Sequence, residues 1–163
     1  MQELSVSIPE IKKDKVIVLI SCVSKKKNTD NGPVATKDLY QSPLFVKSLK
    51  YATKVLKIPE TDIFVLSAEH HLLPLDRQVM KYDKTLNDFT AAQRKEWAGK
   101  VWAQLSNRFG KNTHYIILAG KNYYKYLICN CRITNFELPL GHLSIGQRLS
   151  ALKSAISNNN VIK

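Results

Sequence analysis

The chain has 163 residues, 44% of them hydrophobic, and a formal net charge of +12. This length suits one domain with a single core, and the hydrophobic content excludes a disordered chain. No apolar stretch approaches the ~20 residues that span a bilayer, and the start of the chain lacks the apolar core of a signal peptide. We therefore expect a cytoplasmic protein without membrane contacts, with a flexible N-terminal arm over residues 1–14 and a single α/β domain over residues 15–157.

Strands and helices alternate along the sequence. Apolar runs predict four strands, at residues 16–20, 63–66, 115–118 and 133–136. The first run is typical of a strand buried on both faces of a parallel sheet. Helical spacing of apolar residues predicts helices over 43–58, from Thr90 to Gly110, over 122–128 and after Ser144. The alternation predicts a three-layer α/β/α fold with a central four-stranded, mostly parallel sheet.

The starts of three helices carry capping signals. Ser42 precedes Pro43, which fits an N-cap followed by proline at the first helical position. Thr90 with Gln93 has the spacing of a capping box. Ser144 and Gln147 repeat the same spacing further along the chain.

The unusual residues of this sequence fall in the loops that follow the predicted strands. In a parallel sheet these loops, at 21–39, 67–86, 119–124 and 137–147, meet at the carboxyl edge, where open α/β sheets bind their ligands. The sequence therefore predicts an active or binding site at that edge.

The first loop offers hydroxyls, a thiol, a cation and a carboxylate. Lys25 is either a phosphate contact or a solvated lysine of a triplet. Cys22 fits a buried structural thiol better than a nucleophile, which would need an adjacent base. Asp38 either caps a turn or holds a water molecule or a ribose hydroxyl. Ser21 and Tyr40 complete the candidates from this loop.

The second loop combines carboxylates, imidazoles and an aromatic ring. Glu69 with His70 or His71 could act as acid and base, although adjacent residues of an extended chain point apart. The ring of Tyr82 can stack on a nucleobase, and Asp83 can orient a water molecule. The alternatives are hydrogen-bonded loop histidines and a turn aspartate beside a half-buried tyrosine.

Further candidates lie at other strand ends. Ser67 ends the second predicted strand, and Gly120 would let a ligand approach the third. Tyr123 either stacks on a base or packs in a short amphipathic helix. Arg148 is a candidate phosphate contact, and Gln147 either joins it or only closes the capping box.

Charge and cysteine spacing bear on partners. After Trp97 the only acidic residue is Glu137, and such a basic excess favours nucleic acid, with a solvated basic surface as the alternative. Cys129 and Cys131 lack the spacing of a zinc knuckle, and no second pair completes a tetrahedral site. We expect DNA or another nucleic acid as partner, and neither metal nor cofactor.

The order of several short motifs resembles a known family, the bacterial and phage domains of unknown function related to the YaaA peroxide-stress proteins. The resemblance covers about residues 16–152. Its motifs are SC-x-x-K, A-x-x-DLY-x-S-x-x-F, LSA-x-x-x-LL, YD-x-TL, a tryptophan helix, AG-x-x-Y and PL-x-x-x-x-IGQRL. The matching residues are Ser21, Cys22, Lys25, Ala35, Asp38, Leu39, Tyr40, Ser42, Phe45, Ser67, Ala68, Leu73, Tyr82, Asp83, Leu86, Trp97, Ala119, Gly120, Tyr123, Pro139, Leu140, Ile145, Gly146 and Gln147.

The sequence departs from the family pattern after Ser67-Ala68, where a lysine, an aromatic residue and a glycine are usual. Here the residues are Glu69, His70 and His71. The departure changes the charge and the backbone freedom at the rim of the expected pocket.

The resemblance implies a uracil-DNA-glycosylase-like fold and a link to DNA binding, base modification or phage defence. On that analogy Asp38 and Asp83 would be catalytic, Tyr82 and Tyr123 would hold a flipped base, and Lys25 or Arg148 would bind phosphates. The first hypothesis is a DNA glycosylase that cleaves the N-glycosidic bond of a modified base. The alternatives are a non-catalytic DNA-binding protein and, less favoured by the basic charge, a small-nucleotide hydrolase or transferase.

Overall fold

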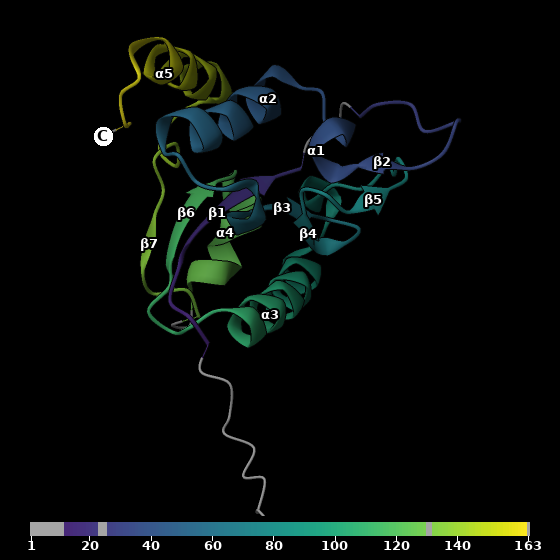
Figure 1. Ribbon diagram of the computed structural model, residues 1–163. Helices are drawn as coiled ribbons and strands as arrows, with labels where there is room; N and C mark the ends of the chain where they lie inside the picture. Colours follow the sequence, from purple (N-terminus) through teal and green to yellow (C-terminus); the bar gives the residue numbers. More distant parts are fainter. Residues whose placement is uncertain (1–11, 23–25, 130–131, 163) are drawn as a thin grey trace, which may run out of the picture.

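The computed structural model describes residues 12–22, 26–129 and 132–162 (Figure 1). Its centre is a five-stranded sheet in the order β4-β3-β1-β6-β7. The strands are β1 (Val16–Ser21), β3 (Ile63–Ser67), β4 (His71–Pro74), β6 (His114–Leu118) and β7 (Phe136–Glu137). β1 pairs in parallel with β3 and β6, and β7 pairs in parallel with β6. The mixed α/β class and the mostly parallel sheet are confirmed.

The predicted count of four strands is wrong, because β4 runs antiparallel to β3 at the edge of the sheet. β4 lies inside the segment predicted as a loop, and its four residues give no alternating pattern to distinguish it. Its inner residues Leu72 and Leu73 are buried. The predicted strand at 133–136 is only the two-residue β7, with Ile133 buried ahead of it.

The central strand β1 explains why the core forms here. Ile17, Val18, Leu19 and Ile20 are at most 1% exposed, as expected for an apolar strand with neighbours on both sides and helices on both faces. Each such side chain stabilises the fold by about 1.5–3 kcal/mol through removal of apolar surface from water.

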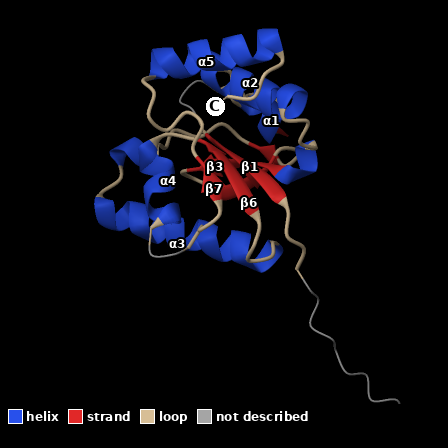
Figure 2. Ribbon diagram, turned by 90° about the vertical axis from the view of Figure 1, so that its left-hand side faces the viewer, coloured by secondary structure: helices blue, strands red, loops and turns tan. Residues whose placement is uncertain are grey.

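Helices lie on both sides of this sheet (Figure 2). α2 (Pro43–Lys50) packs with α5 (Ile145–Asn158) on one side, and α3 (Ala91–Arg108) packs with α4 (Lys121–Ile128) on the other. α2 continues as a π-helical turn, η1 (Tyr51–Val55), and two 3₁₀ turns, η2 (Glu60–Asp62) and η3 (Leu86–Asp88), precede β3 and α3. None of the described helices is long and apolar enough to cross a membrane.

The capping signals are confirmed. The Ser42 side chain accepts a hydrogen bond from the Phe45 backbone N–H, with Pro43 at the first helical position. Complete capping boxes start α3, through Thr90 and Gln93, and α5, through Ser144 and Gln147. These contacts satisfy N–H groups that the first turn of a helix leaves without partners.

A small two-stranded sheet and one helical turn, together called the annex, lie beyond β4. The two-residue strands β2 (Val34–Ala35) and β5 (Gln78–Val79) pair antiparallel, and the single turn α1 (Thr36–Leu39) follows β2. The annex lies to the right of the sheet in Figure 1. It holds the first and second loops beside the carboxyl edge of β1 and β3.

Candidate functional site

Three tyrosines from separate segments of the chain converge beside the carboxyl ends of β1 and β3. The hydroxyl oxygens of Tyr40 and Tyr82 lie 2.5 Å apart. Ser67, the last residue of β3, donates a hydrogen bond from Oγ to the Tyr82 hydroxyl over 2.8 Å, and its Oγ accepts one from the His70 backbone N–H. We call Tyr40, Tyr82 and Tyr123, with Cys22, Lys26 and Ser67, the tyrosine cluster.

Tyr123 reaches the cluster from α4. Its hydroxyl lies 3.2 Å from the Cys22 Sγ and 3.4 Å from the Thr85 Oγ1, and it accepts a hydrogen bond from the Leu86 backbone N–H. Its ring packs edge-to-face on Trp97. The Trp97 indole N–H donates to the Ser67 carbonyl oxygen over 2.8 Å, so α3 and α4 both fix the positions of cluster residues.

Lys26 is the cation of the cluster. It is only 9% exposed, and its Nζ lies 4.4 Å from the centre of the Tyr82 ring and 5.9 Å from that of Tyr40. A positive charge over an aromatic face is attracted by the ring quadrupole. Burial lowers the pKa of Lys26, although the nearby charges of Cys22 and Asp83 act in the opposite direction.

The phenols of the cluster stay neutral at physiological pH. Burial raises the pKa values of Tyr40, Tyr82 and Tyr123 above the ordinary value near 10. Burial also lowers the pKa values of His70 and His71, so both imidazoles are neutral near pH 7. The cluster therefore offers neutral hydroxyl donors and acceptors around one ammonium group.

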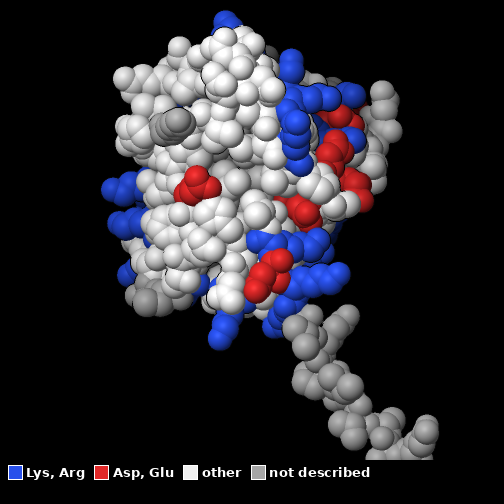
Figure 3. All heavy atoms as spheres, turned by 60° about the vertical axis from the view of Figure 1, so that its left-hand side comes forward, with Lys and Arg blue, Asp and Glu red and all other residues white. Residues whose placement is uncertain are grey.

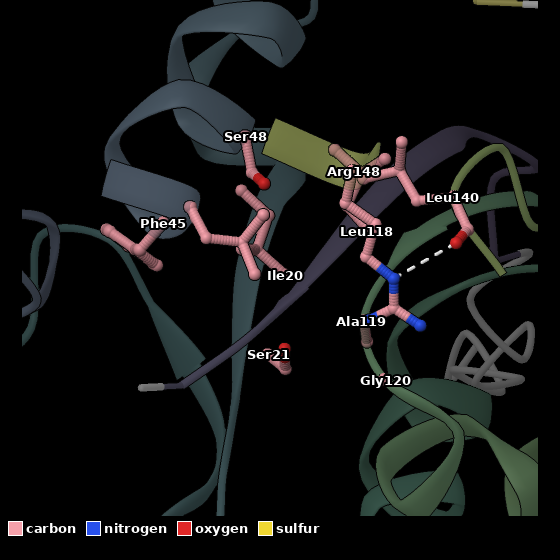
Figure 4. Close-up of a pocket in the computed structure, with 10 residues that line it drawn as sticks. Ile20, Ser21, Phe45, Ser48, Leu118, Ala119, Gly120, Leu140 and Arg148 are labelled. Carbon is pink, nitrogen blue, oxygen red and sulfur yellow. Dashed lines mark hydrogen bonds between the residues drawn. The ribbon is translucent and has the colours of Figure 1, made fainter. Parts of the chain in front are cut away.

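Ser21, Gly120 and Arg148 line a pocket at the carboxyl ends of β1 and β6 (Figure 4). Arg148 donates from Nε to the carbonyl oxygens of Leu140 and Leu143, and its guanidinium points toward Gly120, the residue before α4. The free volume of about 10 Å³ holds about one water molecule. A larger ligand enters only if the surrounding side chains move.

The structure places the predicted residues in three ways. Cys22, Tyr40, Ser67, Tyr82 and Tyr123 belong to the tyrosine cluster, and the ring of His70 packs edge-to-face on Tyr82. Ser21, Gly120 and Arg148 line the pocket. Asp38, Glu69, Asp83 and Gln147 are exposed, and Lys25 lies outside the described residues.

The exposed candidates differ in their surroundings. Asp83 follows Tyr82, and its carboxylate acts to raise the pKa of Lys26. Glu69 pairs with Lys84 over 3.3 Å. Gln147 closes the capping box of α5 with Ser144, which is the structural one of the two roles predicted for it. Asp38, on α1, makes no hydrogen bond or ion pair with its side chain among the residues described.

Sequence reasoning missed three residues of this site. The sequence analysis singles out Lys25 of the lysine triplet, whereas the buried Lys26 forms a β-bridge with Tyr40 and lies over the Tyr82 ring. The sequence places Trp97 on the apolar face of a helix and Thr85 in a loop, and it does not predict their contacts with Ser67 and Tyr123. Within the described ranges, no group of three or more His, Cys, Asp or Glu could hold a metal ion.

Comparison with known proteins identifies the family of this chain. No curated protein and no solved structure matches it. A family of unknown function, DUF6884, matches residues 17–154, which include all the described residues of the tyrosine cluster and of the Arg148 pocket. The chain therefore belongs to the family of unknown function DUF6884.

Proposed function

We propose that this protein acts on nucleic acid as a DNA glycosylase-like enzyme that cleaves the N-glycosidic bond of a modified base. The observation that supports it best is the convergence of Tyr82, Tyr123 and Lys26, with Asp83 beside them, at the carboxyl edge of a parallel sheet. That edge is the usual ligand site of open α/β folds. A uracil-DNA-glycosylase-like arrangement of layers, a relationship to YaaA and a role in phage defence are parts of the same proposal.

The chemistry assigns a role to each group. A base flipped from the duplex would stack on the aromatic rings of the cluster. The Asp83 carboxylate would stabilise the positive charge that develops on the sugar, or orient the attacking water. The water oxygen forms the new bond to C1′ as the C–N bond breaks, and the base leaves with the bonding electrons and takes up a proton. Lys26 and Arg148 would hold phosphates.

Base entry needs a rearrangement of the rim. The hydroxyl of Tyr82 is engaged by Tyr40 and Ser67, and the neighbouring pocket has room for about one water molecule. Tyr82 is only half-buried and the next two residues, Asp83 and Lys84, are exposed, so these three residues would move while Leu86 stays in the core. Unstacking and flipping a base would add a cost of a few kcal/mol.

The direct test is release of a base. Genomic DNAs that carry different modified bases are incubated with the protein, and free bases are identified by mass spectrometry. Asp83→Asn and Asp38→Asn should each reduce release at least 100-fold if both act as proposed. Glu96→Gln is the matched control, because this exposed carboxylate on α3 pairs only with Lys100, over 3.6 Å. Equal release by wild type and both aspartate variants would remove these residues from the mechanism.

The second candidate is a non-catalytic DNA-binding protein. It is favoured by the net charge of +12 and by the small volume of the Arg148 pocket. On the face shown in Figure 3, Lys and Arg lie in several separate groups, some with Asp or Glu beside them. This candidate predicts duplex binding that weakens steeply with salt, and no base release from any substrate.

A further inference from the structure

A second cavity lies at the opposite edge of the sheet from the tyrosine cluster. Its volume is about 390 Å³, within the range of pockets that bind small molecules. It lies between the end of α3, the start of β6 and the segment that leads into β7. In a parallel arrangement this is the amino edge of β1, β6 and β7, so it is separate from the proposed nucleic-acid site.

The walls combine aromatic rings with cations. Trp102, Phe109 and Tyr115 supply the rings, and Lys12, Lys111 and Arg132 supply the positive charges. No Asp or Glu belongs to the described lining. The Asp14 carboxylate, beside the lining residue Gly110, accepts a hydrogen bond from the Asn112 backbone N–H. The cavity therefore suits a flat ring that carries negative charge.

Two of the cations are held by hydrogen bonds, the exposed Lys12 and the partly buried Arg132. Lys12 donates from Nζ to the Ser106 carbonyl oxygen over 2.8 Å, and Arg132 donates from Nη1 to the Tyr126 carbonyl oxygen over 3.3 Å. Lys111, which also lines the cavity, is exposed. The anchored groups keep further N–H donors for a ligand, and their fixed positions limit the side-chain entropy lost on binding.

Tyr115 adds a polar group to the wall of the cavity. This residue on β6 is 4% exposed as a whole. Among the described residues no fully buried side-chain oxygen lacks a hydrogen-bond partner, and the Tyr115 hydroxyl, which has none, is open to solvent in the cavity. Burial of the residue raises its pKa to about 12, so the phenol keeps its proton and can donate a hydrogen bond to a bound molecule.

We propose that this cavity binds a nucleoside monophosphate. The base would stack against Trp102 with the Tyr115 hydroxyl bonded to its edge, and the phosphate would meet Lys111 and Arg132. Aromatic rings bind bases of any sequence by their faces, whereas cationic side chains bind phosphate through charge-assisted hydrogen bonds. The proposal does not depend on the glycosylase function.

The test is calorimetric titration of the full chain with the four nucleoside 5′-monophosphates, the matching nucleosides, inorganic phosphate and benzoate. At least one monophosphate should bind ten times more tightly than its nucleoside, phosphate and benzoate. Absence of saturable binding by every monophosphate overturns the proposal. Equal affinity for a monophosphate and its nucleoside, or tighter binding of benzoate, overturns it as well.

Variants assign the binding to this cavity. Lys111→Gln should weaken monophosphate binding at least fivefold, and Tyr115→Phe, which keeps the ring, should weaken it at least threefold. Lys50→Gln is the matched control, because this exposed lysine lies on α2, on the other side of the sheet. A loss of affinity in Lys50→Gln equal to that in Lys111→Gln shows general charge attraction and contradicts the proposal. Asp83→Asn should leave monophosphate binding unchanged, which separates this test from the glycosylase assay.

Discussion

The hydroxyl groups of Tyr40 and Tyr82 lie 2.5 Å apart, although 42 positions separate the two residues in the chain. Tyr40 follows α1, and Tyr82 belongs to the segment between β5 and η3. The contact joins the first and second loops over the end of β3, where Ser67 donates to the same Tyr82 oxygen. The rim of the candidate site is therefore held by side-chain hydroxyls.

Removal of the Tyr82 hydroxyl tests whether these hydroxyl groups hold the rim of the candidate site. Tyr82→Phe leaves the hydroxyls of Tyr40 and Ser67 without this partner, and both residues are at most 1% exposed. We expect a loss of about 1–3 kcal/mol in the free energy of unfolding, measured by urea denaturation. Tyr124→Phe, on α4 and outside the cluster, is the control and should change it by less than about 0.5 kcal/mol. Equal stability of the Tyr82 variant and wild type would show that the hydrogen bonds of the Tyr82 hydroxyl do not contribute to the free energy of unfolding.

His71 stands in a backbone conformation that favours glycine. Its φ is +64°, at the end of the turn that joins β3 to β4. A side chain costs about 1–2 kcal/mol in this left-handed region. His71→Gly should therefore be about 1 kcal/mol more stable than His71→Ala, since both variants lack the imidazole and differ only at Cβ. Thermal or urea unfolding compares the two, and greater stability of the alanine variant would contradict the assignment.

The stability of the fold should depend on the protonation of His114. Burial acts to lower its pKa, but hydrogen bonds to Glu137 and Asn135 outweigh it and raise the pKa above 6.5. A raised pKa in the folded state means that the ion pair stabilises the protein fully below about pH 6.5 and less as the pH rises through the folded-state pKa. The imidazole and the carboxylate are both partly exposed, so the contribution is at most about 1 kcal/mol.

Urea denaturation of wild type and His114→Gln at pH 6 and pH 8.5 measures this dependence. The stability difference between the two proteins should be larger at pH 6. A difference that is independent of pH, or larger at pH 8.5, would refute the protonated pair. Glu137→Gln should remove the same dependence, because it takes away the negative partner.

Gly110 makes room for the segment that leads into β1. A Cβ at this position would lie 2.1 Å from the Asp14 Oδ1 and 3.0 Å from the Lys12 carbonyl oxygen. Gly110→Ala should displace Asp14, break its hydrogen bond with the Asn112 backbone N–H and cost about 1–3 kcal/mol in unfolding free energy. The cost should be smaller in an Asp14→Ala background, where the closest contact is gone. A double-mutant cycle with no coupling would show that Asp14 does not cause the effect.

The turn after Ser67 gives His71 a positive φ. The sequence predicts only a loop over this segment. It did not identify β4, because four residues after a tight turn carry no periodic signal and form a strand only through their pairing with β3.

The candidate site was predicted in outline and not in its contacts. Five residues chosen from three separate strand ends and loops, Cys22, Tyr40, Ser67, Tyr82 and Tyr123, lie together because the parallel strands end at one edge. The proposed catalytic residue Asp38 is exposed on α1, where sequence position could not distinguish a solvated carboxylate from one directed at a pocket. The cavity beside Tyr115 has no signal in the sequence, because its walls come from four separate segments.

By itself, the sequence determined the α/β class, the central buried strand, the helix caps and the edge where polar loops gather. Each of these depends on residues that are neighbours in the chain or on the period of apolar side chains. The tertiary structure alone determines that Lys26 is buried, which hydroxyls bond to one another and where a cavity remains. These features depend on distances between residues far apart in sequence, and a pattern along the chain contains no such distances.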